Sequence, residues 1–211
     1  MTGTDDPTKR GRLPRSARRA QLMEAAQSVF VESGFHSAAM DEIAERAHVS
    51  KPVLYQHFPG KLDLYLALLD QHTREFPELV RKAVGSTTDN NERVAAAVGA
   101  FFEFVEREDA GFRLVFESDL TNEPAVAERV ERSLDDTADI VSQVVREDTG
   151  LPEEQARLVA VALVGMSQVV ARYWVAQGAP IPREEAARIV GVLGWRGLTG
   201  FPKTGGDEIA G

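Results

Sequence analysis

Apolar side chains recur at intervals of three and four residues along almost all of the 211-residue chain. This spacing is typical of one face of an α-helix, and no segment shows the alternation expected of a strand. The pattern therefore predicts an all-α fold. The chain has no cysteine, which excludes disulfides and thiolate-bound zinc. No apolar run approaches the ~18 residues of a membrane span, so we expect a cytoplasmic protein with no membrane contact.

Glycine and proline divide the N-terminal third of the chain into short helices. The predicted helices cover 16–33, 40–47, 52–58 and a segment that starts at Lys61. Gly34 is expected to stop the first helix, and Pro77 is expected to kink or end the fourth. Only a short turn separates the second helix from the third, which is the arrangement of a helix-turn-helix.

The remaining two thirds of the chain predict longer helices. These cover 89–108, 110–119, 123–148, 152–178 and 182–200. Pro152 and Pro182 suit the first turn of a helix, and Gly178 suits its end. The expected architecture is an N-terminal three-helix domain followed by a larger helical C-terminal domain.

The net charge of −9 is distributed unevenly. Residues 1–72 contain nine basic and nine acidic side chains, so the whole excess of negative charge lies in residues 73–211. Residues 9–19, "KRGRLPRSARR", carry six positive charges and no acid. This asymmetry predicts a basic arm that seeks an anionic partner such as nucleic acid, attached to a body that does not.

Residues 47–61, "AHVSKPVLYQHFPGK", hold an unusual density of polar and ionisable side chains. A metal site is not expected, because the four histidines of the chain are 12, 9 and 15 residues apart and have no thiolate partner. A catalytic site is not expected either, since on one helix Ser50 and His57 would lie ~10 Å apart. We therefore expect no enzyme activity and no cofactor.

The same segment has the features of a helix that presents its N-terminus to phosphate. Ser50 is placed to cap the first turn, where Pro52 is tolerated because the first amides have no partner within the helix. Free N–H groups and the positive end of the helix dipole favour an anion there. Tyr55 and Lys61 are ordinary phosphate ligands, whereas Leu54 and Phe58 are expected in the core.

The run "GFHSAAMDEIAERAHVSKPVLYQHFPGKLDLYLAL" resembles the N-terminal DNA-binding domain of TetR-family transcriptional regulators. That domain commonly has the pattern I-A-x-x-A-G-V-S-x-x-x-L-Y-x-H-F-x-x-K-x-x-L. The matching positions in this chain are Ile43, Ala44, Ala47, Val49, Ser50, Leu54, Tyr55, His57, Phe58, Lys61 and Leu64. The clear similarity ends near residue 70, beyond which only the helical character and the length agree.

The resemblance implies that a dimer places one recognition helix per subunit in successive major grooves of double-stranded operator DNA. Base edges would be approached by Lys51, Pro52, Val53 and Gln56, and of these only Lys51 and Gln56 have side chains that hydrogen-bond to bases. The backbone would be held by Ser37, Ser50, Tyr55, His57 and Lys61. Arg12 and Arg15, in the basic arm, would reach the minor groove or screen phosphates.

Two positions depart from the family pattern. His48 stands in the turn where the family usually has glycine, and histidine enters the left-handed region more readily than most residues. Ala38 and Ala39 stand where a threonine usually opens the second helix and contacts phosphate. Ser37 is expected to replace that threonine as cap and phosphate contact.

The resemblance also implies that the C-terminal domain dimerises and binds a small-molecule effector. The expected homodimer interface consists of apolar and small residues of the last two helices, which are Val161, Gly165, Val169, Ile189, Val192, Leu193 and Gly197. The expected ligand pocket is lined by Phe101, Phe104, Phe112, Phe116, Met166 and Tyr173.

The domain organisation that follows has four parts. These are a flexible basic arm at 1–14, a helix-turn-helix DNA-binding domain at 15–60, a ligand-binding and dimerisation domain at 61–201, and a flexible tail at 202–211. The function expected is that of a repressor released from a palindromic operator by an effector. An activator or a ligand-independent DNA-binding protein of the same fold is the alternative.

Overall fold

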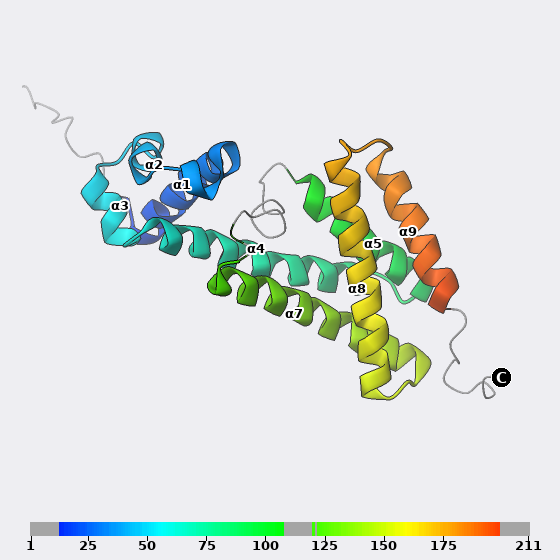
Figure 1. The fold of residues 1–211 in the computed structure, drawn as a ribbon. Coiled ribbons are helices and arrows are strands. Elements are labelled where there is room, and N and C mark those ends of the chain that lie inside the picture. The colour runs from blue at the N-terminus through cyan, green and yellow to red at the C-terminus, as the bar shows by residue number, and fades with distance from the viewer. Residues whose placement is uncertain (1–12, 108–119, 121, 199–211) are drawn as a thin grey trace, which may run out of the picture. The chain divides into compact units, whose positions relative to one another are not determined.

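The computed structural model describes residues 13–107, 120 and 122–198. Within these residues all regular structure is helical, which confirms the predicted fold class. The helices are α1 (Arg15–Ser37), α2 (Met40–Arg46), α3 (Lys51–His57), α4 (Lys61–Val84), α5 (Asn90–Glu106), α7 (Pro124–Thr149), α8 (Glu153–Ala176) and α9 (Arg183–Leu198) (Figure 1). The expected helix at 110–119, the tail at 202–211, Arg12, Phe112 and Phe116 lie outside the described residues.

The chain divides into two compact units at Ala67 and Leu68, within α4. The sequence placed the boundary at the start of this helix instead. The difference arises because the first two turns of α4 belong to the core of the N-terminal unit. Leu64 and Tyr65 are buried there, and the Tyr65 ring meets the Phe30 ring edge-on with 5.3 Å between the centroids.

The N-terminal unit is built on the apolar face of α1. The predicted inward residues of this helix, Leu22, Ala26, Val29 and Phe30, are all buried. Gly34 interrupts the helix with φ 73°, a value that glycine adopts at little steric cost. The expected stop is therefore present, although one further helical turn follows before Ala38.

Pro77 lies inside α4, and the helix continues through it to Val84. A proline has no N–H, so the carbonyl oxygen of Thr73, four residues earlier, loses its helical partner. The Ser133 hydroxyl of α7 donates a hydrogen bond of 2.8 Å to that oxygen. In Figure 1, α4 and α7 run side by side, and the Arg129 guanidinium of α7 also donates to the Asp70 carboxylate at 2.7 Å. The replacement partner explains why Pro77 does not end the helix.

Replacing Ser133 by alanine should lower the free energy of unfolding by about 1–2 kcal/mol, because a buried carbonyl loses its donor. The loss should shrink in a Pro77→Ala background, since residue 77 can then donate its own N–H to Thr73. Urea denaturation of the four proteins in this cycle measures the coupling. Equal losses in both backgrounds would show that the serine does not compensate for the proline.

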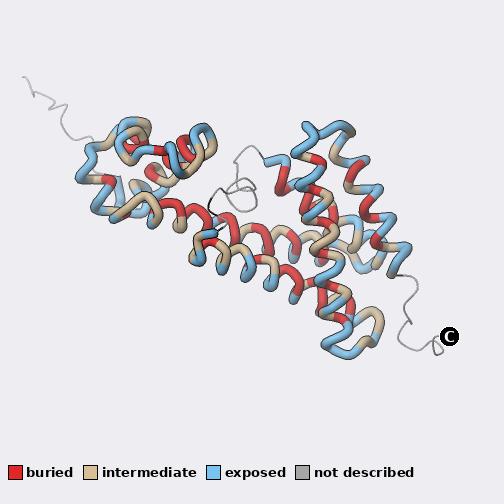
Figure 2. Tube along the Cα trace, viewed as in Figure 1, coloured by how far each residue is buried: buried red, intermediate tan, exposed pale blue. Residues whose placement is uncertain are grey.

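The C-terminal unit places α5 against α8 and α9, and α8 also packs along α7. α5 begins after the N-cap Asp89, whose side chain accepts the N–H of Glu92 at 2.9 Å. α8 ends at Ala176, two residues before the predicted stop Gly178, which has φ 74°. Figure 2 shows the buried side of α5 and α7 turned toward the neighbouring helices of this unit. This packing positions the walls of the pocket described below.

Candidate nucleic-acid interface and ligand pocket

The turn between α2 and α3 is closed by a Schellman motif. The N–H of Val49 donates to the carbonyl of Ala44 at 3.0 Å, and the N–H of His48 donates to that of Glu45 at 2.9 Å. His48 has φ 52°, so it occupies the left-handed position for which the family pattern uses glycine. Its side chain is exposed. The histidine therefore fits the turn at the cost of backbone strain.

A His48→Gly substitution should raise the free energy of unfolding by about 0.5–1 kcal/mol, because glycine enters this region without a Cβ clash. His48→Ala should not stabilise the protein, since alanine keeps the clash. Chemical denaturation of both variants compares them directly. A His48→Gly protein no more stable than His48→Ala would show that the turn is unstrained.

α3 begins at Lys51, one residue earlier than the pattern predicted, and Pro52 occupies its first turn. Ser50 stands in the N-cap position with an extended backbone. Its hydroxyl makes no capping hydrogen bond, which corrects the expectation that it would. Ser50 is exposed, so its hydroxyl is accessible at the start of α3.

The side chains expected to contact DNA bases and phosphates lie on the outer face of α3. Lys51, Pro52, Tyr55 and Gln56 are exposed, and Val53 is half-buried. The opposite face carries Leu54, which is fully buried as predicted, and Phe58 is buried just beyond the end of the helix.

The Lys51 ammonium lies 2.5 Å from the Asp41 carboxylate of α2, and both side chains remain more than half exposed. Such a surface pair contributes little to stability, so the ammonium can exchange it for another anion.

A basic cluster lies beside the C-terminal end of α3. Burial, and then the charges of Arg15, Arg19 and Arg18, hold the pKa of His57 below its usual range. Arg19 also stacks over the Phe58 ring at 4.3 Å. The cluster includes Arg15, which the sequence assigned to DNA contact. An anion placed beside this cluster would offset the arginine charges that lower the pKa of His57 and would favour the protonated ring.

Lys61 is bound within the N-terminal unit rather than free. Its ammonium donates to the carbonyl oxygens of Phe35, His36 and Ala38 at 2.6, 3.0 and 2.9 Å. It also lies 4.6 Å from the centroid of the Phe35 ring. An ammonium has three donors, and all three are used. This geometry makes Lys61 a cap for the C-terminal end of α1 and favours that role over the expected phosphate contact, which stays a prediction.

Ser37 does not cap α2. The N-cap of that helix is Ala39, which makes no side-chain hydrogen bond. Ser37 is the last residue of α1 and is exposed. Its expected contact with phosphate stays a prediction.

The C-terminal unit contains a cavity of about 440 Å³ between α5, α7, α8 and α9. Its apolar wall is aliphatic for the most part and consists of Val84, Val94, Ala97, Val98, Phe101, Val141, Val144, Val145, Leu163, Val164 and Trp195. Polar residues from the start of α5 and the end of α7 form the rest of the lining, with Ser167 of α8. This volume lies in the usual range for small-molecule sites.

The expected aromatic lining is wrong in most of its described members. Phe101 lines the cavity, but Phe104 is buried against Phe76 with 4.9 Å between ring centroids. Tyr173 is 65% exposed, and Met166 is only half-buried and is not part of the lining. The helical spacing identified apolar positions but not the direction in which each side chain points.

Two family profiles match the chain. The profile of bacterial regulatory proteins of the tetR family matches residues 22–68, and that of the tetracyclin repressor-like C-terminal domain matches residues 90–197. The second match alone spans more than half of the chain. The chain belongs to the TetR family. It is a TetR-type DNA-binding transcriptional regulator, and this family and its relatives are regulators rather than enzymes.

Three similar TetR-family proteins cover most of the chain. The HTH-type transcriptional activator FasR of Mycolicibacterium smegmatis is 48% identical over 92% of this chain and 88% of its own length. A TetR-like transcriptional regulator from Rhodococcus sp. RHA1 is 30% identical over 90% and 100%, with a TM-score of 0.67. FadR from Bacillus subtilis, solved in complex with stearoyl-CoA, is 18% identical over 83% and 96%, with a TM-score of 0.69. The last likeness shows the fold alone.

The expected TetR-type dimer face is apolar and uncovered. Val169 and Leu193 are 63% and 62% exposed, and Val161, Ile189 and Val192 are exposed as well. A Cβ built at Gly165 or Gly197 meets no atom within 4 Å. Figure 2 shows the exposed stretches along α8 and α9, which lie side by side in the chain's C-terminal unit.

α8, residues Glu153–Ala176, is long and apolar enough to cross a membrane by length and composition. Its buried residues Ala156, Ala160, Val164, Ser167 and Ala171 follow one helical face. The apolar character is therefore divided between a core face and an uncovered face.

Proposed function

We propose that this TetR-family regulator acts in the bacterial cytoplasm as a homodimer whose operator binding responds to an amphiphilic small molecule in the C-terminal cavity. The observation that carries this proposal is a mainly aliphatic cavity with polar residues at one end. The FadR structure in complex with stearoyl-CoA, which has the same fold, supports the choice of an acyl compound as the first probe.

Dimerisation is proposed from the uncovered face of α8 and α9. Exposed apolar patches of this kind mark interaction sites, and an isologous contact between two copies covers both at once. A two-fold protein matches a palindromic operator, whose half-sites lie one helical turn apart. Equilibrium sedimentation at micromolar concentration tests the state directly, and a monomer alone would contradict the proposal.

Activation is the proposed output. The support is the FasR relative, which is named a transcriptional activator and matches nearly the whole chain. Repression by promoter occlusion is the second candidate. In vitro transcription from a promoter next to the operator separates the two, because the protein should raise transcript yield if it activates and lower it if it represses.

α4 is the proposed coupling element. It begins at Lys61, which caps α1 in the N-terminal unit, and ends at Val84, which lines the cavity. The Ser133 bond to Thr73 attaches the helix to α7, another wall of the cavity. Suppose that α4 has two positions and that only one of them allows the dimer to bind DNA. A ligand that binds one conformation more tightly then shifts the equilibrium toward it, by an amount set by the ratio of its two affinities.

On α3, Tyr55 and Gln56 are expected to have different roles in DNA binding. Tyr55→Phe should weaken binding about five- to tenfold on operator and on unrelated DNA alike, because it removes one hydrogen bond to phosphate. Gln56→Ala should weaken operator binding alone, because the amide reads a base edge. Fluorescence anisotropy with both DNAs provides the comparison. A Tyr55→Phe effect confined to the operator would assign the tyrosine to base reading instead.

A further inference from the structure

The cavity lining changes from apolar to polar along its two long helices. On α5 the lining runs from Phe101 back to Asn90, and on α7 it runs from Val141 forward to Thr149. These lengths are about 16 Å and 12 Å at the helical rise of 1.5 Å per residue. The two polar ends meet, because Arg93 of α5 contacts Asp148 of α7. The cavity therefore matches a ligand with an apolar body and a polar head.

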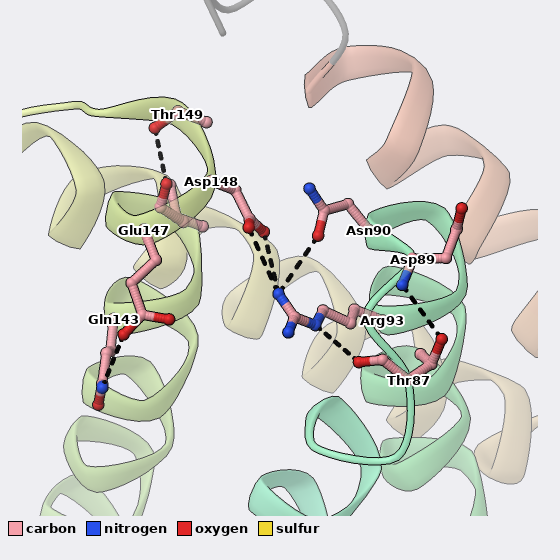
Figure 3. A network of polar contacts seen from close by, with 9 residues as sticks. Thr87, Asp89, Asn90, Arg93, Gln143, Glu147, Asp148 and Thr149 are labelled. Carbon is pink, nitrogen blue, oxygen red and sulfur yellow. Dashed lines mark hydrogen bonds and ion pairs between the residues drawn. The ribbon is translucent and has the colours of Figure 1, made fainter. Parts of the chain in front are cut away.

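Arg93 is the cation at this polar end, and its side chain is held in place (Figure 3). Nε donates to the carbonyl of Thr87 at 2.9 Å, and Nη1 donates to the Asn90 side chain at 3.3 Å. Nη2 makes no hydrogen bond to the described part of the chain. A guanidinium has five N–H donors in a planar fork, so both N–H groups of Nη2 remain for an anion.

Asp148 meets Arg93 loosely. Both carboxylate oxygens lie 3.4 Å from the same nitrogen, Nη1, at the outer limit of a hydrogen bond. A well-formed bidentate pair uses two nitrogens at ~2.7–2.9 Å. Asp148 lies in the last turn of α7, and its side chain is about a quarter exposed.

The geometry points to Arg93 as the head-group residue of the cavity, with Asp148 as the carboxylate that occupies it when no ligand is bound. The ligand class is an acyl or alkyl amphiphile with a carboxylate or phosphate head. Its anion takes the fork of Arg93 and displaces Asp148, while its chain fills the aliphatic wall. This inference rests on the proposed ligand-binding function of the cavity and adds the chemistry of the head.

Three probes of equal chain length test the head-group assignment on the full-length protein. These are dodecanoate, dodecyl phosphate and the neutral 1-dodecanol, titrated by intrinsic tryptophan fluorescence, to which Trp195 on the cavity wall contributes. Wild-type protein should bind the anions about tenfold or more tightly than the alcohol. Arg93→Gln should remove that preference, with the alcohol unchanged within about twofold. The tighter of the two anions then identifies the head as carboxylate or phosphate.

Asp148→Asn provides a control of opposite sign. It removes the competing charge, so it should strengthen binding of both anions about three- to tenfold and leave the alcohol unchanged. A purely structural role for the pair would weaken all three probes together in both variants, and that result overturns the inference. Equal binding of anions and alcohol by wild-type protein overturns it as well, with the cavity function intact. If none of the probes binds, the proposed function fails and the inference fails with it.

Discussion

Replacing Lys61 by methionine is expected to lower the free energy of unfolding by about 2–3 kcal/mol and to leave the salt dependence of DNA binding unchanged. Methionine keeps the unbranched side chain but leaves the carbonyls of Phe35, His36 and Ala38 without their shared donor. Phe35 and His36 lie in the last turn of α1 and Ala38 directly follows it, so their carbonyls have no partner within the helix. Thermal denaturation followed by circular dichroism measures the loss of stability.

Lys51 is the matched control for Lys61. Its ammonium is exposed and pairs only with Asp41 at the surface, so Lys51→Met should change stability by less than about 1 kcal/mol. Each lysine–phosphate contact contributes about 0.9 to the slope of log affinity against log salt. Lys51→Met should therefore reduce the slope by about that amount. If Lys61→Met instead reduces the slope of log affinity against log salt and leaves stability normal, Lys61 contacts DNA phosphate.

A glutamate at Leu193 should leave the protein monomeric at micromolar concentration and weaken operator binding by about 100-fold or more. The leucine is 62% exposed in the single chain and lies in the apolar face of α8 and α9. In the proposed dimer, two copies of the charge would be buried close to the two-fold axis without a partner. Loss of the dimer removes the second half-site contact, which supplies most of the avidity.

The Gln143→Glu protein is the control for charge alone. Gln143 is exposed on α7, outside the proposed interface, and the substitution adds the same charge to the same unit. It should sediment as a dimer with operator affinity within about twofold of wild type. If Leu193→Glu also remains dimeric, the face of α8 and α9 is not the dimer interface.

The helix boundaries could be predicted from residues close to each boundary in the sequence. Gly34 and Gly178 adopt the positive φ values that end a helix, and Pro52 lies in a first turn. The helix-turn-helix and its buried residues follow from spacing within one segment. Such features depend on residues only a few positions apart, so a single sequence is enough to predict them.

Features that depend on distant partners could not be predicted in this way. A proline such as Pro77 ends a helix unless another group donates to the carbonyl that the missing N–H leaves unbonded. That donor is Ser133, which lies 56 positions further along the chain. The role of Lys61 depends likewise on carbonyls that only the folded unit brings to its ammonium. The cavity was expected to be aromatic because phenylalanines are conspicuous in α5, yet packing turns Phe104 into the core.

The central claim is that occupancy of the cavity controls operator binding. The direct test is the operator affinity of wild-type protein with and without saturating stearoyl-CoA, on a palindrome selected from the source genome. A coupling of about 1–3 kcal/mol changes that affinity about 5- to 150-fold, and this is the predicted result. Stearoyl-CoA that binds the protein, as followed by intrinsic tryptophan fluorescence, but leaves operator affinity unchanged would contradict this proposal.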